Sequence, residues 1–125
     1  MYEVSIRDHF DAAHYLREYG GKCENLHGHR FQVVVSIKTD KTDDTGLAYD
    51  FTILKQHLRE ILERIDHTCL NEIPPFDKVN PSSENISRSI YNELKTKLEK
   101  AEVIISNIQV WESPDSCITY YPEET

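Results

Sequence analysis

The side chains best suited to chemistry gather near the start of the chain. His14 precedes the run Cys23-Glu24-Asn25-Leu26-His27-Gly28-His29, in a chain that holds only six histidines and three cysteines. Imidazole and thiolate are the ligands that Zn2+ prefers in proteins. Because side chains two positions apart leave the same face of a β-strand, His27 and His29 can present two nitrogens to one ion. The pattern predicts a zinc site built from His14, His27 and His29.

Cys23 allows two interpretations of that site. As a fourth ligand, its thiolate would close the shell and make the zinc structural. As a free thiol, it would stand beside a site that keeps an open position, which is the catalytic arrangement. Its neighbours are polar and loop-like, which favours a reactive thiol over a buried one. The three cysteines are widely spaced, so we expect free thiols and leave Cys69 and Cys117 with structural roles.

Asp66-His67 and Glu112 are the remaining candidates for chemistry. A carboxylate beside a histidine can orient the imidazole for proton transfer, although a histidine after a helix can also simply interact favourably with the helix dipole. Glu112 follows an apolar strand-like segment. Its carboxylate can be a solvated charge, or it can bind an N–C–N fragment such as a 2-amino-pyrimidinone by accepting two parallel hydrogen bonds.

The elements that must position these residues follow from the apolar pattern. Strands are expected at 2–8, 31–37, 103–111 and 117–121. A helical stripe covers 52–65, with Thr52 as its cap, and a second stripe follows a cap at Ser82 or Ser83. The order β-β-α-α-β-β predicts an α+β fold, with both helices covering one face of an antiparallel sheet.

Size and charge narrow the class of protein. A chain of 125 residues fits a single domain, 1–125, with its own core. The formal net charge of -8 argues against a nucleic-acid partner held through phosphates. No apolar run is long enough to span a membrane, and no secretory signal is visible, so a cytoplasmic location is expected.

These motifs occur together in the order of one known family. They are Phe10-Asp11-Ala12-Ala13-His14, Cys23 through His29, Asp50-Phe51, Asp66-His67, Pro81-Ser82-Ser83-Glu84-Asn85 and Glu112. Together they resemble the 6-pyruvoyl-tetrahydropterin synthase / 6-carboxy-tetrahydropterin synthase family across nearly the whole chain. The resemblance implies a tunnelling fold (T-fold), a four-stranded antiparallel sheet with two helices on one face. It also implies a homo-oligomer in which three subunits close a barrel and two trimers form a hexamer.

The resemblance also implies roles for the residues. His14, His27 and His29 would bind Zn2+, and Cys23 would be the base that moves a proton at the substrate side chain. Asp66 and His67 would complete the proton relay, often across a subunit boundary, and Glu112 would anchor the pterin ring. The family substrate is 7,8-dihydroneopterin triphosphate; candidates for holding its triphosphate are Lys22, His9 and Arg17.

The interval of three residues between Cys23 and His27 resembles the carboxy-forming branch of the family. That branch yields 6-carboxy-5,6,7,8-tetrahydropterin, acetaldehyde and triphosphate for 7-deazaguanine and queuosine biosynthesis. One alternative is a 6-pyruvoyl-tetrahydropterin synthase on the same scaffold. Another is a non-catalytic oligomer with a structural zinc site, in which Cys23 and the three histidines occupy all four coordination positions. A zinc hydrolase acting through metal-bound water is a weaker possibility.

Overall fold

The computed structural model describes residues 1–18, 20–21 and 24–122. Its elements are β1 (Tyr2–His14), β2 (His27–Thr39), α1 (Phe51–Glu63), β3 (Thr68–Cys69), the 3-10 turn η2 (Leu70–Glu72), α2 (Ser83–Lys97), β4 (Ile104–Ser113) and β5 (Ser116–Tyr120). The predicted β-β-α-α-β-β order is confirmed, with β3 as an addition between the helices. A strand of two residues is too short to show an alternation of apolar and polar side chains, so the sequence pattern does not predict β3.

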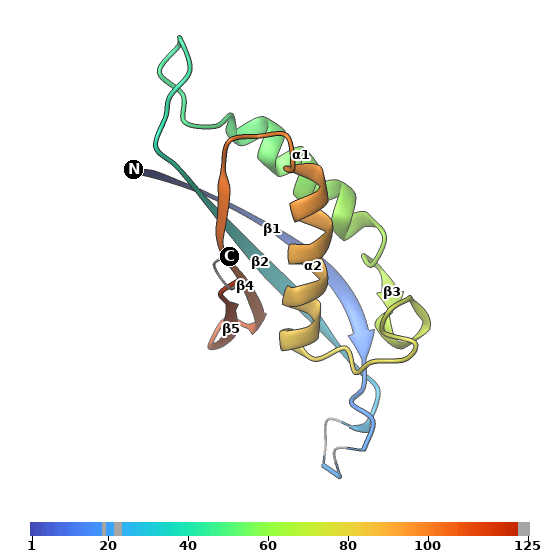
Figure 1. Cartoon of the computed structure of the whole chain (residues 1–125). Helices are drawn as coiled ribbons and strands as arrows, with labels where there is room; N and C mark the ends of the chain where they lie inside the picture. Colours follow the sequence, from blue (N-terminus) through green and yellow to red (C-terminus); the bar gives the residue numbers. More distant parts are fainter. Residues whose placement is uncertain (19, 22–23, 123–125) are drawn as a thin grey trace.

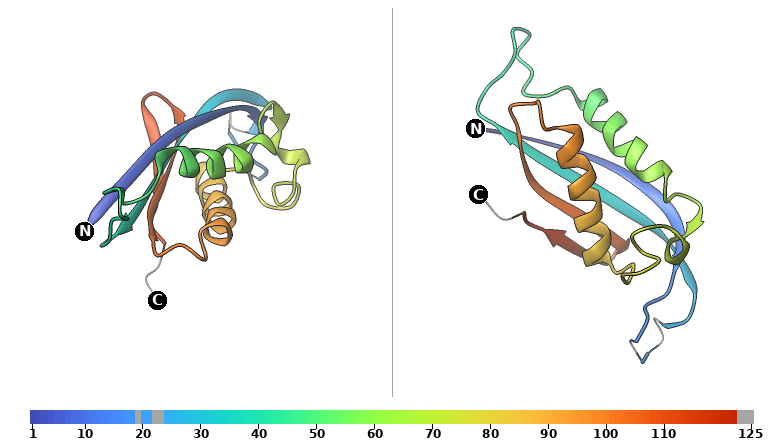
Figure 2. Two further views of the ribbon diagram at one scale, coloured as in Figure 1. Left: turned by 90° about the horizontal axis from the view of Figure 1, so that it is seen from above. Right: turned by 45° about the vertical axis from the view of Figure 1, so that its right-hand side comes forward.

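The five strands form one sheet in the order β3-β1-β2-β4-β5. Strands β1, β2, β4 and β5 pair antiparallel, which is the four-stranded sheet that the resemblance implies. The short β3 runs parallel to β1 at the edge of the sheet. Both helices lie on the same face of the sheet, as Figures 1 and 2 show from three directions.

The first two strands are longer than their apolar patterns predict. Pairing of β1 with β2 continues from Tyr2 opposite Thr39 to His14 opposite His27. The sequence pattern breaks at the polar residues in the second half of β1, but ladder hydrogen bonds join backbone groups whatever the side chains are. The added length carries His14 and His27 to the same end of the sheet.

The core lies between the helices and the covered face of the sheet. Alternate residues of β2 point into it, so Phe31, Val33, Val35 and Ile37 are fully buried. The helices contribute apolar stripes at helical spacing, which are Leu54, Leu58, Ile61 and Leu62 of α1 and Ile86, Ile90 and Leu94 of α2. Ile53, which the apolar pattern of 52–65 would include in the buried stripe, is instead 45% exposed.

The starts of the two helices are set by side-chain caps. Asp50, and not the predicted Thr52, caps α1, since its carboxylate accepts a hydrogen bond from the Thr52 backbone N–H at 2.8 Å. Ser82 caps α2 by accepting from the Asn85 N–H at 3.1 Å. Each cap satisfies an N–H group that the first turn of a helix leaves without an internal partner. The Ser82 cap fixes where α2 begins, next to the end of β1.

The face of the sheet away from the helices carries polar side chains. Across β1 and β2, Arg7 donates to Gln32 at 3.0 Å, and Arg30 donates to both oxygens of Asp11 at 2.9 and 3.1 Å. Cross-strand polar pairs of this kind suit a surface in contact with water or with a polar partner. Within the described ranges, neither helix combines the length and apolar content that crossing a bilayer requires.

Candidate metal centre

The register of β1 and β2 brings the three predicted histidines together. His14 lies opposite His27, and His29 lies opposite Ala12, so all three side chains leave the same face of the paired strands. The ring centroids are 4.7 Å apart for His14 and His27, 4.8 Å for His27 and His29, and 5.3 Å for His14 and His29. The predicted grouping of these three imidazoles is therefore present in the fold.

Backbone carbonyls orient two of the rings. The Pro81 carbonyl lies 2.8 Å from His14 Nδ1, and the Asn25 carbonyl lies 2.6 Å from His27 Nδ1. A carbonyl can only accept a hydrogen bond, so each Nδ1 must carry a proton, and in the neutral ring the lone pair is then on Nε2. Fixing the tautomer through the second ring nitrogen is how proteins prepare histidines to bind metals.

The Nε2 atoms that face the centre of the cluster lack hydrogen bonds. Among the described residues, neither His14 Nε2 nor His29 Nε2, both buried, has a hydrogen-bond partner. Glu112 Oε1 lies 2.9 Å from His29 Nε2 and 3.4 Å from His14 Nε2, close to both but without hydrogen-bond geometry. A buried nitrogen without a partner is costly unless another group takes its lone pair. The donor set of three imidazoles and a carboxylate fits Zn2+.

Burial favours the form of His14 that can bind a metal. The ring is 2% exposed and packs against Phe31, with centroids 5.3 Å apart. Burial lowers the pKa of His14, and the nearby His27 and His29 act in the same direction, against the opposing effects of the Pro81 carbonyl and Glu112. His14 is thus held neutral at physiological pH, and a neutral imidazole is the ligand form.

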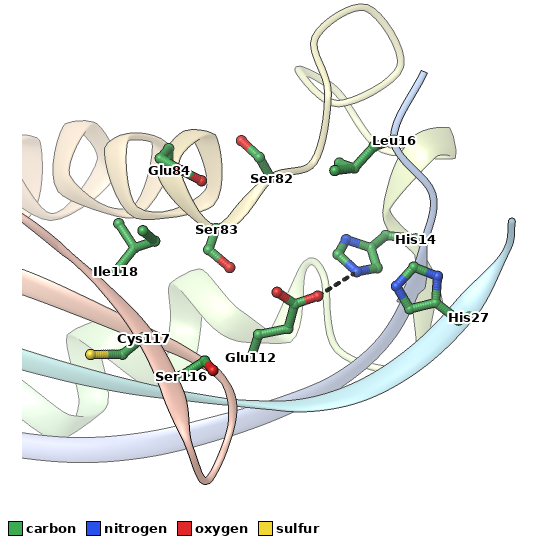
Figure 3. Close-up of a pocket in the computed structure, with 10 residues that line it drawn as sticks. All are labelled: His14, Leu16, His27, Ser82, Ser83, Glu84, Glu112, Ser116, Cys117 and Ile118. Carbon is green, nitrogen blue, oxygen red and sulfur yellow. Dashed lines mark ion pairs between the residues drawn. The ribbon is translucent and has the colours of Figure 1, made fainter. Parts of the chain in front are cut away.

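A cavity of about 240 Å³ opens beside the cluster. His14 and His27 line one side, Ser82 and Ser83 at the start of α2 line another, and Glu112 lies between them. Figure 3 shows the carboxylate of Glu112, a residue of β4, pointing toward the His14 ring. A small polar molecule in this cavity would contact Glu112 and the histidines together.

The Asp66–His67 pair lies apart from this cavity. Asp66 Oδ1 is 3.0 Å from His67 Nδ1, as expected for a carboxylate that orients an imidazole. The backbone N–H of Asp11 donates to Asp66 and its carbonyl accepts from the His67 N–H, directly before Ala12 and Ala13, which pair with β3. Neither Asp66 nor His67 lines the cavity, so the described part of one chain forms two separate groups of polar side chains.

Two asparagines that the sequence reasoning missed hold the segment that follows β1. Asn71 accepts from the Tyr15 N–H and donates to the Tyr15 carbonyl, both at 3.0 Å. Asn80 does the same for Arg17, at 2.8 and 3.0 Å. Each side-chain amide makes the two hydrogen bonds that a neighbouring strand would make. The backbone N–H and C=O groups of Tyr15 and Arg17, which lie beyond the last residue pair of β1 and β2, are thereby satisfied. In the sequence, only the position of Asn80 directly before Pro81, which is typical of a turn, points to a structural role for this asparagine.

The other predicted residues are placed as follows. Cys23 and Lys22 lie outside the described residues. The Arg17 guanidinium donates to the carbonyl of Phe76 at 2.9 Å and to that of Val79 at 3.3 Å, so it supports the loop before α2. Cys69 and Cys117 are free thiols, as predicted.

Comparison with known sequences identifies relatives that match nearly the whole chain. The family model described as "6-pyruvoyl tetrahydropterin synthase" matches residues 3–123. The 6-carboxy-5,6,7,8-tetrahydropterin synthase of Bacillus subtilis is 30% identical over 130 residues, covering 98% of this chain and 87% of that protein. The enzyme of the same name from Synechocystis is 35% identical over 118 residues, covering 90% of this chain and 87% of its own length.

Solved structures show the same fold. The 6-pyruvoyl tetrahydropterin synthase of Caenorhabditis elegans superimposes with a TM-score of 0.84 at 26% identity, covering 98% of each chain. The Plasmodium vivax protein of that name gives a TM-score of 0.78 at 22% identity, again over 98% of each chain. The expected tunnelling fold is confirmed by this agreement.

Proposed function

Because the chain belongs to the 6-pyruvoyl tetrahydropterin synthase family, we propose that it is a zinc-dependent 6-carboxy-5,6,7,8-tetrahydropterin synthase. Its substrate would be 7,8-dihydroneopterin triphosphate, and its products 6-carboxytetrahydropterin, acetaldehyde and triphosphate. The names of the relatives support a tetrahydropterin synthase, a lyase-type enzyme. We further propose that residues 1–125 work as one cytoplasmic domain that supplies the 7-deazaguanine and queuosine pathway.

One observation carries the proposed chemistry. Among the described residues, the buried Nε2 atoms of His14 and His29 have no hydrogen-bond partner, and both lie within 3.4 Å of Glu112, which borders the cavity. In the proposed enzyme His14, His27 and His29 hold Zn2+, which as a Lewis acid would lower the pKa of the substrate's side-chain hydroxyls. Three protein ligands leave a position for the substrate, in the way that catalytic zinc sites do.

Glu112 is proposed to anchor the pterin ring. Its carboxylate borders the cavity and remains 36% exposed, so a ligand can reach it. An ionised carboxylate accepts two parallel hydrogen bonds, which match the 2-amino group and adjacent ring N–H of a pterin. The same carboxylate lies near His29, so a role as a fourth zinc ligand is the competing interpretation.

The proton-moving residues are proposed to be Cys23, Asp66 and His67. Cys23 would take a proton from the substrate side chain, and His67, oriented by Asp66, would take or return another during loss of triphosphate. Since Asp66 and His67 do not line the cavity of their own chain, we propose that they serve the cavity of a neighbouring subunit. A hexamer formed by two trimers would provide that neighbour and would cover the free edges of the sheet.

The branch within the family rests on two observations. The Bacillus subtilis and Rickettsia felis relatives, which cover 98% and 92% of this chain, are named as carboxy-forming enzymes, and Cys23 is separated from His27 by three residues. A pyruvoyl-forming reaction is the second candidate, because a Dictyostelium discoideum protein named 6-pyruvoyl tetrahydrobiopterin synthase is also 30% identical, over 105 residues.

Product analysis separates the candidates. The zinc-loaded protein is incubated with 7,8-dihydroneopterin triphosphate, and the pterins and acetaldehyde are measured by mass spectrometry. A 6-carboxy product with equimolar acetaldehyde supports the proposal, whereas a pyruvoyl product without acetaldehyde assigns the chain to the other branch. Unchanged substrate would favour a structural zinc site.

Two variants test the site itself. In the proposed enzyme, Cys23→Ala keeps zinc but loses turnover, whereas His27→Ala loses both. In the alternative closed site of one cysteine and three histidines, Cys23→Ala loses zinc as well. A hydrolase that works through metal-bound water would keep its activity in Cys23→Ala.

A further inference from the structure

Asp66 receives contacts on both of its carboxylate oxygens. Oδ1 accepts a hydrogen bond from the Asp11 backbone N–H at 2.9 Å and lies 3.0 Å from His67 Nδ1. Oδ2 accepts from Nη2 of Arg59, a residue of α1, at 3.4 Å. The carboxylate is therefore held between the ring that it orients and a guanidinium on the opposite side.

Arg59 is itself anchored to β1. Its Nη1 donates to Asp8 Oδ1 and to the His9 carbonyl, both at 3.2 Å. A guanidinium is a planar fork with fixed directions, so contacts at Nη1 determine where Nη2 points. The side chain is only 33% exposed. Arg59 thus links the middle of β1 to the turn after α1.

The His67 ring depends on Asp66 for its orientation. Its backbone adopts a left-handed conformation, with φ of 59°, and its N–H donates to the Asp11 carbonyl at 2.6 Å. Such a conformation is unfavourable for a residue with a side chain, and it is often retained at functional sites. The side chain is 77% exposed, and among the described residues its ring has a single polar partner, Asp66.

We propose that Arg59 is a positioning residue for the Asp66–His67 pair. By holding Oδ2, Arg59 keeps Oδ1 at 3.0 Å from His67 Nδ1, where it can accept the Nδ1–H and leave Nε2 as the nitrogen that exchanges protons with the substrate. Arg59 acts through Asp66 and touches no reacting atom. This inference rests on the proposed function, in which the pair moves protons.

Charge supports the same role. Burial raises the pKa of Asp66, but the Asp11 N–H and the charges of His67 and Arg59 outweigh it, so the net shift is downward. An ionised Asp66 accepts the Nδ1–H of His67, whereas a protonated one competes as a donor. The Arg59 guanidinium is a permanent cation, so it favours the ionised form of Asp66 throughout the working pH range.

Steady-state kinetics of the zinc-loaded protein test this role. We expect Arg59→Met to lower kcat about 10- to 100-fold with KM changed less than about threefold, because a misplaced proton-transfer group slows chemistry more than binding. Arg59→Lys should recover part of kcat. Arg64→Met is the matched control, since Arg64 is the C-cap of α1 and makes comparable contacts, 3.0 Å to Glu93 and 2.7 Å to the Pro74 carbonyl.

A double variant distinguishes a positioning effect of Arg59 on Asp66 from a general stabilisation of the fold. If Arg59 acts through Asp66, Asp66→Asn combined with Arg59→Met should be no slower than Asp66→Asn alone. Additive losses, or an equal loss of kcat in Arg64→Met, would overturn the proposal. So would an Arg59→Met variant with the kcat of the wild type.

A readout independent of turnover keeps this inference distinct from the proposed function. Nitrogen-15 NMR of the His67 imidazole should show the Nδ1–H tautomer in the wild type and a mixture of tautomers in Arg59→Met. That result with no pterin product would reject the proposed reaction and leave the positioning role standing. Pterin turnover with an unchanged His67 spectrum in Arg59→Met would reject the positioning role alone.

Discussion

The substitution Glu112→Gln distinguishes a pterin anchor from a fourth zinc ligand. Glutamine preserves the shape of the side chain but replaces one accepting oxygen with a donating NH2 group. A pterin presents two N–H donors to this position, so one hydrogen bond is lost and two donors face each other. Zinc, in contrast, would still have the three imidazoles, whose ring centroids lie 4.7–5.3 Å apart.

The size of the effect follows from the exposure and contacts of Glu112. A hydrogen bond to a charged group contributes about 1.5–3 kcal/mol, which corresponds to about a 10- to 150-fold weaker dissociation constant for the pterin. The folded protein should hardly be affected. Glu112 is 36% exposed, and partly exposed ion pairs stabilise proteins by about 0–1 kcal/mol.

Two measurements on the same preparation decide between these roles. Zinc per chain is measured by elemental mass spectrometry, and binding of 7,8-dihydroneopterin is measured by calorimetry. Glu102→Gln serves as the control, because that carboxylate pairs with Lys41 at 3.0 Å on the surface and is 77% exposed. A zinc content below half that of the wild type would make Glu112 a metal ligand. A pterin affinity within about threefold of the wild type would refute the anchor.

Three further predictions concern the scaffold around the site. Ser82→Ala removes the cap of α2 and should lower the free energy of unfolding by about 0.5–2 kcal/mol in urea titrations; an unchanged midpoint would contradict the cap. Leu58→Ala leaves a hole at a fully buried position and should cost about 2–5 kcal/mol in the same assay, whereas Ile53→Ala at an exposed position should cost much less. Folding depresses the pKa of Asp66 below 3.8, so its stabilisation is present above that pH and lost as the pH falls. The stability difference between the wild type and Asp66→Asn should therefore shrink as the pH falls below about 3.8, and a constant difference would contradict the shift.

Local patterns were sufficient to predict the two helices, the four longer strands and the grouping of His14, His27 and His29. The alternation in Phe31–Ile37 and the stripe through Ile86, Ile90 and Leu94 report burial directly, because each side chain follows the period of its own backbone. The boundaries were less accurate. Asp50 displaced Thr52 as the cap, and β1 continued to His14, since caps and ladder bonds depend on backbone partners.

Groups far apart in the sequence decided the rest of the site. The Pro81 carbonyl selects the tautomer of His14 across 67 positions, and a carbonyl carries no signal in the sequence. Asn71 reaches the backbone of Tyr15 across 56 positions, and Arg59 reaches Asp8 across 51. Such contacts exist only once the sheet and helices have packed.

The sequence by itself therefore determined which candidate ligands the chain offers, because the residue types and the short spacing of His27 and His29 limit the donors available. Tertiary structure alone decided how these groups meet. Pairing of β1 with β2 placed His14 opposite His27, while Asp66 and His67, in the turn after α1, lie outside the cavity. The physical reason is that strand register and helix packing are set by burial of the whole core, which no short motif records.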